Sequence, residues 1–234
     1  MRAPEPERPR QPFSAMELRT HPVLARVLPF ATYIAFLVAD SVRPDELGGG
    51  WLYVAQIAAV AALLAWFWPA YEELRGGPRP TGRDWLLGLA VGAIVFALWI
   101  NLDFGWAQVG SGRGVAGELA ANDRHVGLLL RLLGAVLVVP VMEELFWRSF
   151  LMRWLENREF RAVDPRSVSW RAVSITSVVF GAEHHLWLAG IVAGLAYGWL
   201  YRHTGSIWTV ILAHALTNLL LEVWVHRTGS WQFL

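Results

Sequence analysis

The sequence predicts an all-α, polytopic membrane protein, a helical bundle with about seven transmembrane helices. Its 234 residues are 55% hydrophobic and only 17% charged, whereas soluble domains carry about a quarter charged residues. The apolar residues are also gathered into blocks rather than scattered along the chain. A helix that crosses a bilayer needs roughly 20 mostly apolar residues in succession, and several blocks approach or reach that length.

Seven segments are predicted to be the membrane helices, in the order 23–39, 51–70, 85–100, 126–155, 170–185, 186–201 and 206–225. The fifth is less apolar than the others, but it lies between two apolar blocks. Tryptophan is common where helices meet the membrane interface. Such residues stand at both ends of the second, third and seventh segments: Trp51 and Trp68, Trp85 and Trp99, Trp208 and Trp224.

The segment before the first helix, residues 1–22, is expected to form a flexible cytoplasmic tail. It holds five prolines and four arginines, and it offers little apolar surface to bury. Because this polar lead is long, the first apolar block is interpreted as a signal anchor rather than a cleaved signal peptide. Residues 23–234 are predicted to form a single membrane domain.

The arginines predict a multi-pass protein of the cell (inner) membrane with a cytoplasmic N-terminus. In that orientation the inner segments hold 14 of the 20 arginines and the outer segments hold four, as the positive-inside rule requires. Arg131 and Arg148 remain, both inside the fourth helix. The inner segments are 1–26, 71–84, 153–172 and 202–205.

Composition also excludes several functions. The chain contains no cysteine, which excludes disulfides, thiolate metal sites and cysteine catalysis. A net charge of +1 gives no reason to expect nucleic acid as a partner. The glycine-rich stretch GSGRG in the loop 101–125 is not a phosphate-binding loop, because no Gly-Lys-Ser/Thr follows it. Membrane lipid is the expected partner.

Three ionisable residues lie within the fourth helix: Glu143, Glu144 and Arg148. A charge in the bilayer core costs at least a few kcal/mol, so each is a functional candidate. Arg148 follows Glu144 by four residues and shares its helix face, which predicts an ion pair between them. Glu143 is then left without a partner of opposite charge in this helix. Pro140 cannot donate to the carbonyl of Val136, so a kink is expected just before the carboxylates.

Two other helices carry polar groups at the same predicted depth. At about 1.5 Å per residue, Glu143 and His184 each lie roughly 18 Å from the inner ends of their helices, and His214 and Asn218 lie roughly 12–18 Å from theirs. Hydrolysis needs a base that takes a proton from water and donors that stabilise an oxyanion. We therefore predict Glu143 as the base, with His184 sharing the water and with neutral His214 and Asn218 as donors.

These clusters form the pattern of a known family. The motif EExxxR is present as Glu143, Glu144 and Arg148, FxxxH as Phe180 and His184, and HxxxN as His214 and Asn218. All three motifs occur in this order on separate predicted helices within residues 140–220. The sequence thereby resembles the CPBP family of intramembrane endopeptidases, which comprises CAAX proteases and bacteriocin-processing enzymes (the Abi group).

The resemblance implies an all-helical membrane fold whose active site lies in a cavity among the helices. It also implies a membrane-associated protein or peptide as partner and substrate, cleaved at a peptide bond near the membrane surface, often close to its C-terminus. In such a site Glu143 and His184 would activate water, and His214 with Asn218 would form the oxyanion site. Glu144 would assist, held by the motif arginine. The flanking Glu183 and His185 depart from the pattern by adding further titratable groups.

The residues leave the question of a metal open. Glu143, His184 and His214 are a ligand set that catalytic zinc accepts, but they come from three helices without the HExxH spacing. A site without a cofactor is favoured, and zinc is the alternative.

Two other functions compete with the peptidase. A proton-coupled transporter would more often contain repeats, which the sequence lacks, and an idle scaffold or immunity protein can lose motif residues, whereas none is lost here.

Overall fold

The computed structural model describes residues 14–43, 50–110 and 124–233 of the chain. Within these ranges the chain is helical and contains no strand, so the predicted fold class is confirmed. The principal helices are α2 (Pro22–Ser41), α3 (Gly50–Trp66), α5 (Gly82–Trp99), α7 (Arg124–Leu133), α8 (Val139–Glu144), α9 (Met152–Trp154), α10 (Trp170–Ala182), α11 (Trp187–Thr204) and α12 (Ile207–Thr228).

Each of the seven predicted segments coincides with a helix of the structure, with α7 to α9 forming the long fourth one. Among the described residues, α2, α5 and α12 are long and apolar enough to cross a membrane, and α3 is apolar but shorter. The passage of the other segments through the bilayer stays a prediction. The proposed tail falls mostly on residues 1–13, outside the described part of the chain. Its last residues form the short helix α1 (Ala15–Arg19), capped by Ser14.

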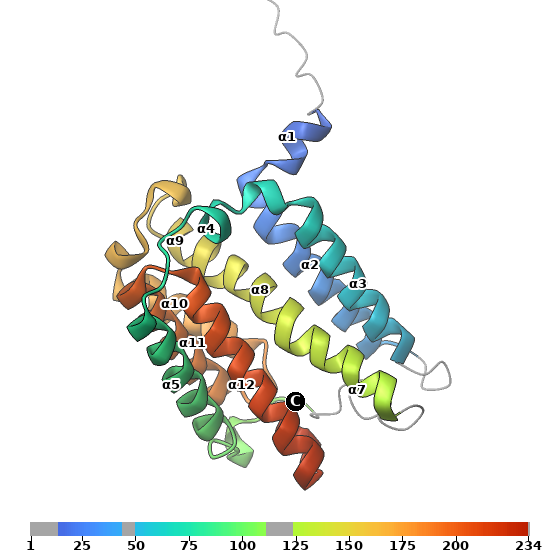
Figure 1. The fold of residues 1–234 in the computed structure, drawn as a ribbon. Coiled ribbons are helices and arrows are strands. Elements are labelled where there is room, and N and C mark those ends of the chain that lie inside the picture. The colour runs from blue at the N-terminus through green and yellow to red at the C-terminus, as the bar shows by residue number, and fades with distance from the viewer. Residues whose placement is uncertain (1–13, 44–49, 111–123, 234) are drawn as a thin grey trace, which may run out of the picture.

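The fourth helix runs through the middle of the bundle (Figure 1). On one side of it α2 packs against α3, and on the other side α5 packs on α12 and α10 packs on α11. Two π-helical turns interrupt it, Gly134–Val138 before α8 and Leu145–Leu151 after it. The first turn lies just before Pro140, where a proline removes a backbone donor and such turns are common. The two carboxylates therefore lie on a short α-helical piece between two irregular turns.

Small residues allow the helices around the site to approach closely. A Cβ added at Gly190 of α11 would lie 2.8 Å from the Cα of Gly181 in α10, and one at Gly92 of α5 would lie 2.5 Å from the carbonyl oxygen of Ala213 in α12. Small residues at helix interfaces permit this packing in membranes, where dispersion contacts drive association. This packing positions the end of α10, just before His184, and the middle of α12, which carries His214.

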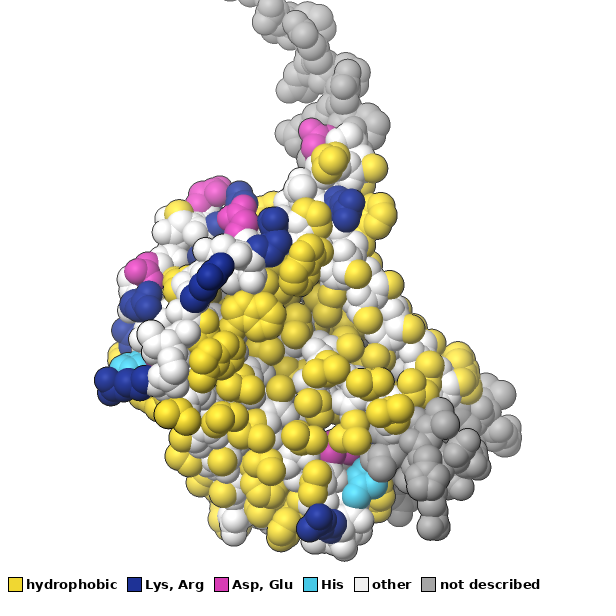
Figure 2. Space-filling model, in the orientation of Figure 1, with side chains coloured by type: hydrophobic (Ala, Val, Ile, Leu, Met, Phe, Trp, Pro, Cys, Tyr) yellow, Lys and Arg dark blue, Asp and Glu magenta, His cyan; other side chains and the backbone are white. Residues whose placement is uncertain are grey.

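Charged side chains gather at one end of the molecule, near α9 and the short helix α4 (Glu72–Arg75), whereas a broad apolar surface covers the helices below it (Figure 2). The segments 71–84 and 153–172, which were both predicted to be cytoplasmic, lie at that same end (Figure 1). This arrangement is that of a bundle with an apolar belt. Which end faces the cytoplasm stays a prediction.

Candidate active site

The fourth helix supplies a buried ion pair. The Nη1 atom of Arg148 donates to Oε1 of Glu144 over 3.0 Å, and the two side chains are only 3% and 0% exposed. This is the pair that their spacing predicted. The guanidinium also lies over two aromatic rings, 4.6 Å from the centre of Phe180 and 5.3 Å from that of Tyr197. The two cation–π contacts hold Arg148, and its charge-assisted hydrogen bond holds Glu144, so that Glu143 is left for another role.

His214 of α12 completes this cluster. Its Nδ1 lies 2.7 Å from Oε1 of Glu144, and its Nε2 lies 3.9 Å from Oε2 of Glu143. The ring also stacks on Tyr197, with 5.2 Å between ring centroids. Since a carboxylate oxygen only accepts, the Nδ1 of His214 donates to Glu144, and a neutral ring then has its lone pair on Nε2. His214 can therefore donate to an oxyanion only as an imidazolium, which modifies the neutral donor expected from the sequence.

His184 comes from the end of α10. This helix stops at Ala182, earlier than the predicted boundary at residue 185, and His184 follows in a bend. Its Nδ1 lies 2.7 Å from the carbonyl oxygen of Phe180, and the two rings are 4.6 Å apart. Since a carbonyl oxygen only accepts, Nδ1 carries the proton and Nε2 has the free lone pair. Phe180 thus positions His184 with its backbone, while its ring covers the motif arginine.

The two residues that flank His184 have different partners. The Nδ1 of His185 lies 2.8 Å from the carbonyl oxygen of Val109, in the loop after α5. Glu183, in contrast, joins Glu143 and His184: one ligand atom from each of these three residues lies within 4.8 Å of the others. Two carboxylates and an imidazole are a donor set that zinc accepts. A metal would therefore be held by Glu183 in place of the predicted third ligand, His214, whose Nδ1 is engaged by Glu144.

Asn218 lies one turn after His214, half-buried on the same side of α12. Its Nδ2 donates over 2.8 Å to the carbonyl oxygen of Ala135, in the first π-helical turn. A side-chain amide has two N–H groups, so one of them is left for a ligand. The irregular turn before Pro140 therefore has a use, because it offers a carbonyl that orients the amide of the third motif.

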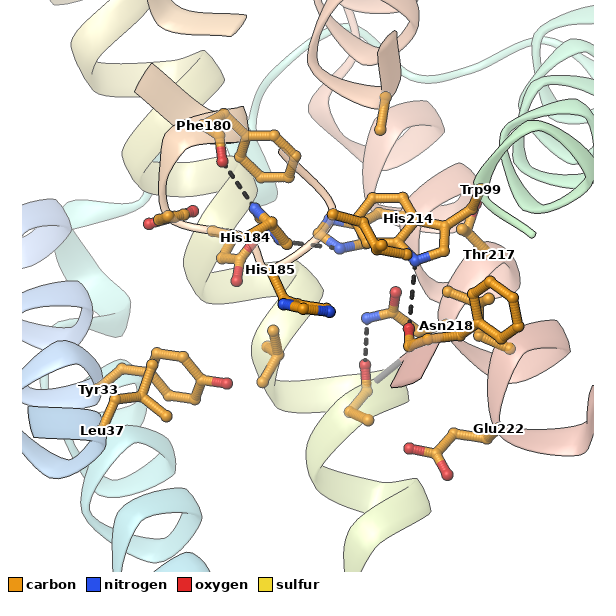
Figure 3. Close-up of a pocket in the computed structure, with 18 of the residues that line it drawn as sticks. Tyr33, Leu37, Trp99, Phe180, His184, His185, His214, Thr217, Asn218 and Glu222 are labelled. Carbon is orange, nitrogen blue, oxygen red and sulfur yellow. Dashed lines mark hydrogen bonds and ion pairs between the residues drawn. The ribbon is translucent and has the colours of Figure 1, made fainter. Parts of the chain in front are cut away.

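The motif residues surround one cavity of about 380 Å³, a size typical of ligand sites. Glu143, His184, His214 and Asn218 all line it. Figure 3 shows the two histidines and Asn218 facing the same space, with the hydroxyl of Tyr33 pointing into it from α2. The cavity continues past Asn218 to Arg131 and Glu222. The helices that were predicted to carry one site thus do bring their polar groups together.

Several lining residues were not singled out by the sequence. Tyr33 lies in the first apolar helix, in no motif, and only its position in the fold places it in the wall of the cavity that Glu143 also lines. Tyr197 belongs to a glycine-rich apolar run, and its hydroxyl donates to Thr217 of α12 over 2.7 Å. Arg131 was noted as a charge inside the fourth helix, but nothing in the sequence paired it with Glu222, 91 residues further along the chain.

Comparisons with known proteins agree with the motifs. Residues 125–220 match the model of the family described as type II CAAX prenyl endopeptidase Rce1-like, and all three motifs lie inside that segment. YdiL, a candidate membrane peptidase of Bacillus subtilis (strain 168), is 26% identical over 182 residues, which are 75% of this chain and 71% of the relative. No solved structure matches the chain. The resemblance to the CAAX protease family is thereby confirmed, and with it a relation to membrane peptidases.

Proposed function

We propose that this protein is an intramembrane endopeptidase that hydrolyses a peptide bond of a membrane-associated protein or peptide with water activated by Glu143 and His184. One observation carries the proposal: motif residues from three separate helices line the same cavity, where ligand atoms of Glu143 and His184 lie within 4.8 Å of each other. If the charges of the fourth helix formed only a structural ion pair, neither the histidines nor the cavity beside them would be needed.

The first step uses the two acceptors on this side of the cavity. A water between them donates one proton to the carboxylate of Glu143 and a hydrogen bond to the Nε2 of His184, whose Nδ1–H is held by Phe180. As the proton passes to Glu143, the water oxygen attacks the peptide carbonyl carbon. General base catalysis of this kind requires a base within hydrogen-bonding reach of the proton it takes.

The second step stabilises and then breaks the tetrahedral intermediate. Its oxyanion accepts hydrogen bonds from Nε2–H of protonated His214 and from the free N–H of Asn218. The carboxylate of Glu144, whose Oε1 lies 2.7 Å from Nδ1 of His214, supports the positive ring. Glu143 then gives its proton to the leaving amine nitrogen, and the C–N bond breaks. Arg148 acts through Glu144 and is a positioning residue.

We propose this mechanism without a metal. Glu143, Glu183 and His184 would suit zinc, and a bound zinc would supply an acidified water. The hydrogen bonds of His184 and Asn218, however, already leave an acceptor and a donor for hydrolysis, and a protonated His214 adds a second donor. A catalytically idle scaffold has no need of them, and a transporter is less well supported, since the comparisons name peptidases.

We also propose a multi-pass protein of the cell membrane with a cytoplasmic N-terminus, on the strength of the arginine distribution. Reporter fusions after residues 78 and 162 should then report the cytoplasm, and fusions after residues 45 and 115 the outer side. The last two positions lie outside the described residues. Reversed readings at two or more of the four fusions would overturn this orientation.

The function is tested by comparing the termini of membrane proteins in cells that carry the wild-type gene, no gene, or Glu143→Gln. We expect new termini with the wild-type protein only. Glu159→Gln, a change of the same type at an exposed residue of the α9–α10 loop, is the matched control and should behave as wild type. Identical termini in all strains would contradict the proposal, provided that the proteins are present in equal amounts.

A further inference from the structure

A second buried ion pair lies in the same cavity, beyond Asn218. The Nε of Arg131 in α7 donates to both carboxylate oxygens of Glu222 in α12, over 2.7 and 3.0 Å. The two side chains are only 8% and 2% exposed. None of the three motifs contains either residue, and the proposed hydrolysis uses neither. Figure 3 shows Glu222 about one turn of α12 beyond Asn218, on the side of the cavity away from His214.

This pair leaves a donor unused. Among the residues that the structure describes, the Nη1 of Arg131 is buried without a hydrogen-bond partner. A guanidinium offers five N–H groups in a planar fork, and Glu222 occupies only its Nε. A buried donor without an acceptor costs free energy, so this edge of the fork is suited to an acceptor that arrives from the cavity, which Arg131 and Glu222 both line.

We infer that Arg131 is the specificity subsite of this cavity and binds a carboxylate of the substrate. The inference rests on the proposed peptidase function. A carboxylate is the acceptor that matches a guanidinium in charge and geometry. His226 also lies beside Glu222, with its Nδ1 3.6 Å from Oε2 of the carboxylate. The Trp231 ring lies 5.7 Å from the guanidinium and covers it.

The position of Arg131 sets the distance from this carboxylate to the scissile bond. Glu222 lies eight residues after His214, or about 12 Å along α12, and Arg131 lies twelve residues before Glu143, or about 18 Å along its helix. An extended peptide covers about 3.3–3.6 Å per residue. The carboxylate therefore belongs roughly three to five residues beyond the bond that is cut. A terminal carboxylate and the side chain of an internal Glu both satisfy this spacing.

Binding is tested separately from cleavage. The probes are N-lauroyl octapeptides of leucine and alanine with a free terminal carboxylate, with a terminal carboxamide, or with a carboxamide and an internal Glu. They are titrated against full-length Glu143→Gln protein in phosphatidylcholine nanodiscs. We expect the acid to bind at least about 10-fold more tightly than the amide, as for a hydrogen bond to a charged group. The internal Glu should restore binding if a side chain is what Arg131 accepts.

Two variants in this background connect the preference with Arg131. Arg131→Lys keeps a positive partner for Glu222 but loses the fork. The double variant Arg131→Gln/Glu222→Gln removes both charges of the pair, so that no buried carboxylate is left unpaired to destabilise the protein. In both, the ratio of acid to amide affinity should fall toward one. Arg161→Lys, in the exposed pair with Glu72 near α4, is the matched control and should keep the ratio.

The outcomes separate this inference from the proposed function. Equal binding of acid and amide, or a ratio that survives both Arg131 variants, overturns the subsite even if the active enzyme cleaves peptides. A preference that disappears when phosphatidylglycerol is added to the nanodiscs overturns it in favour of a lipid headgroup. A preference that depends on Arg131 in a protein that cleaves no peptide supports the subsite and contradicts the peptidase.

Discussion

Two buried arginine–glutamate pairs, one toward each end of the bundle, differ in how completely the guanidinium is bonded. Arg26 of α2, 1% exposed, binds both oxygens of Glu73. It also donates to the hydroxyl of Ser149 and to two backbone carbonyl oxygens. Arg131 donates through its Nε to Glu222 and has a buried nitrogen without a partner among the described residues.

The difference separates a structural pair from one that is ready for a ligand. A buried guanidinium is better compensated when each of its nitrogens has an acceptor, and Arg26 satisfies this condition while joining α2, α4 and the second π-helical turn. Arg131 satisfies it only in part, and it does so on the wall of the cavity. The same two residue types thus hold the helices together in one place and present a donor in the other.

The largest expected effect on stability is that of breaking the Arg26–Glu73 pair. Arg26→Leu removes the cationic partner of the part-buried Glu73 and, among the described residues, leaves it only the hydroxyl of Ser149, so the free energy of unfolding should fall by about 3–5 kcal/mol. Arg131→Leu should cost less, since His226 remains beside Glu222. Thermal unfolding in detergent measures both. The exposed pair Arg161–Glu72 is the control, because Arg161→Leu should cost about 1 kcal/mol or less. Equal losses for Arg26 and Arg131 would remove the distinction drawn here.

The next effect concerns the pair inside the active site. Arg148→Leu removes the cation that holds Glu144 and should destabilise the protein by about 3–5 kcal/mol, offset in part by the bond from His214. Activity should fall too, because Glu144 no longer positions His214. The amount of folded protein and the activity per folded molecule are measured separately. A stable and active Arg148→Leu protein would show that the pair does not organise the site.

The smallest expected effect is that of metal removal. Glu143, Glu183 and His184 could hold zinc, but the proposed mechanism does not require it. Protein treated with a chelator should keep its activity and should contain far less than one metal ion per chain. Stoichiometric zinc, with activity that is lost on its removal and regained on its return, would instead make these three residues ligands.

Sequence reasoning was sufficient for features that depend on local patterns. The apolar blocks gave every long helix, and counting residues along them placed Glu143, His184 and His214 at one depth. Pro140 indicated irregularity before α8, but no residue indicated the second π-helical turn after it. The proton positions on His214 could not be predicted, since they depend on a contact with Glu144 across 70 residues.

Contacts between distant helices also explain what the sequence did not reveal about Glu183 and Arg131. Glu183 was seen only as a neighbour of the motif histidine, and the early end of α10 is what turns it toward Glu143. Arg131 was noted only as a charge inside the fourth helix, and Glu222 was not singled out. Only the packing of α12 beside the fourth helix makes them a pair on the wall of the cavity.

The central claim is that Glu143 performs the chemistry while its neighbour Glu144 serves to hold His214. The most direct measurement is the cleavage rate of purified Glu143→Gln protein in liposomes, with a peptide substrate identified from the comparison of termini. The account predicts a folded protein with the thermal stability of the wild type and a rate about 10²- to 10⁴-fold lower, the usual contribution of a general base. A Glu143→Gln protein that cleaves this peptide at the wild-type rate would contradict the claim.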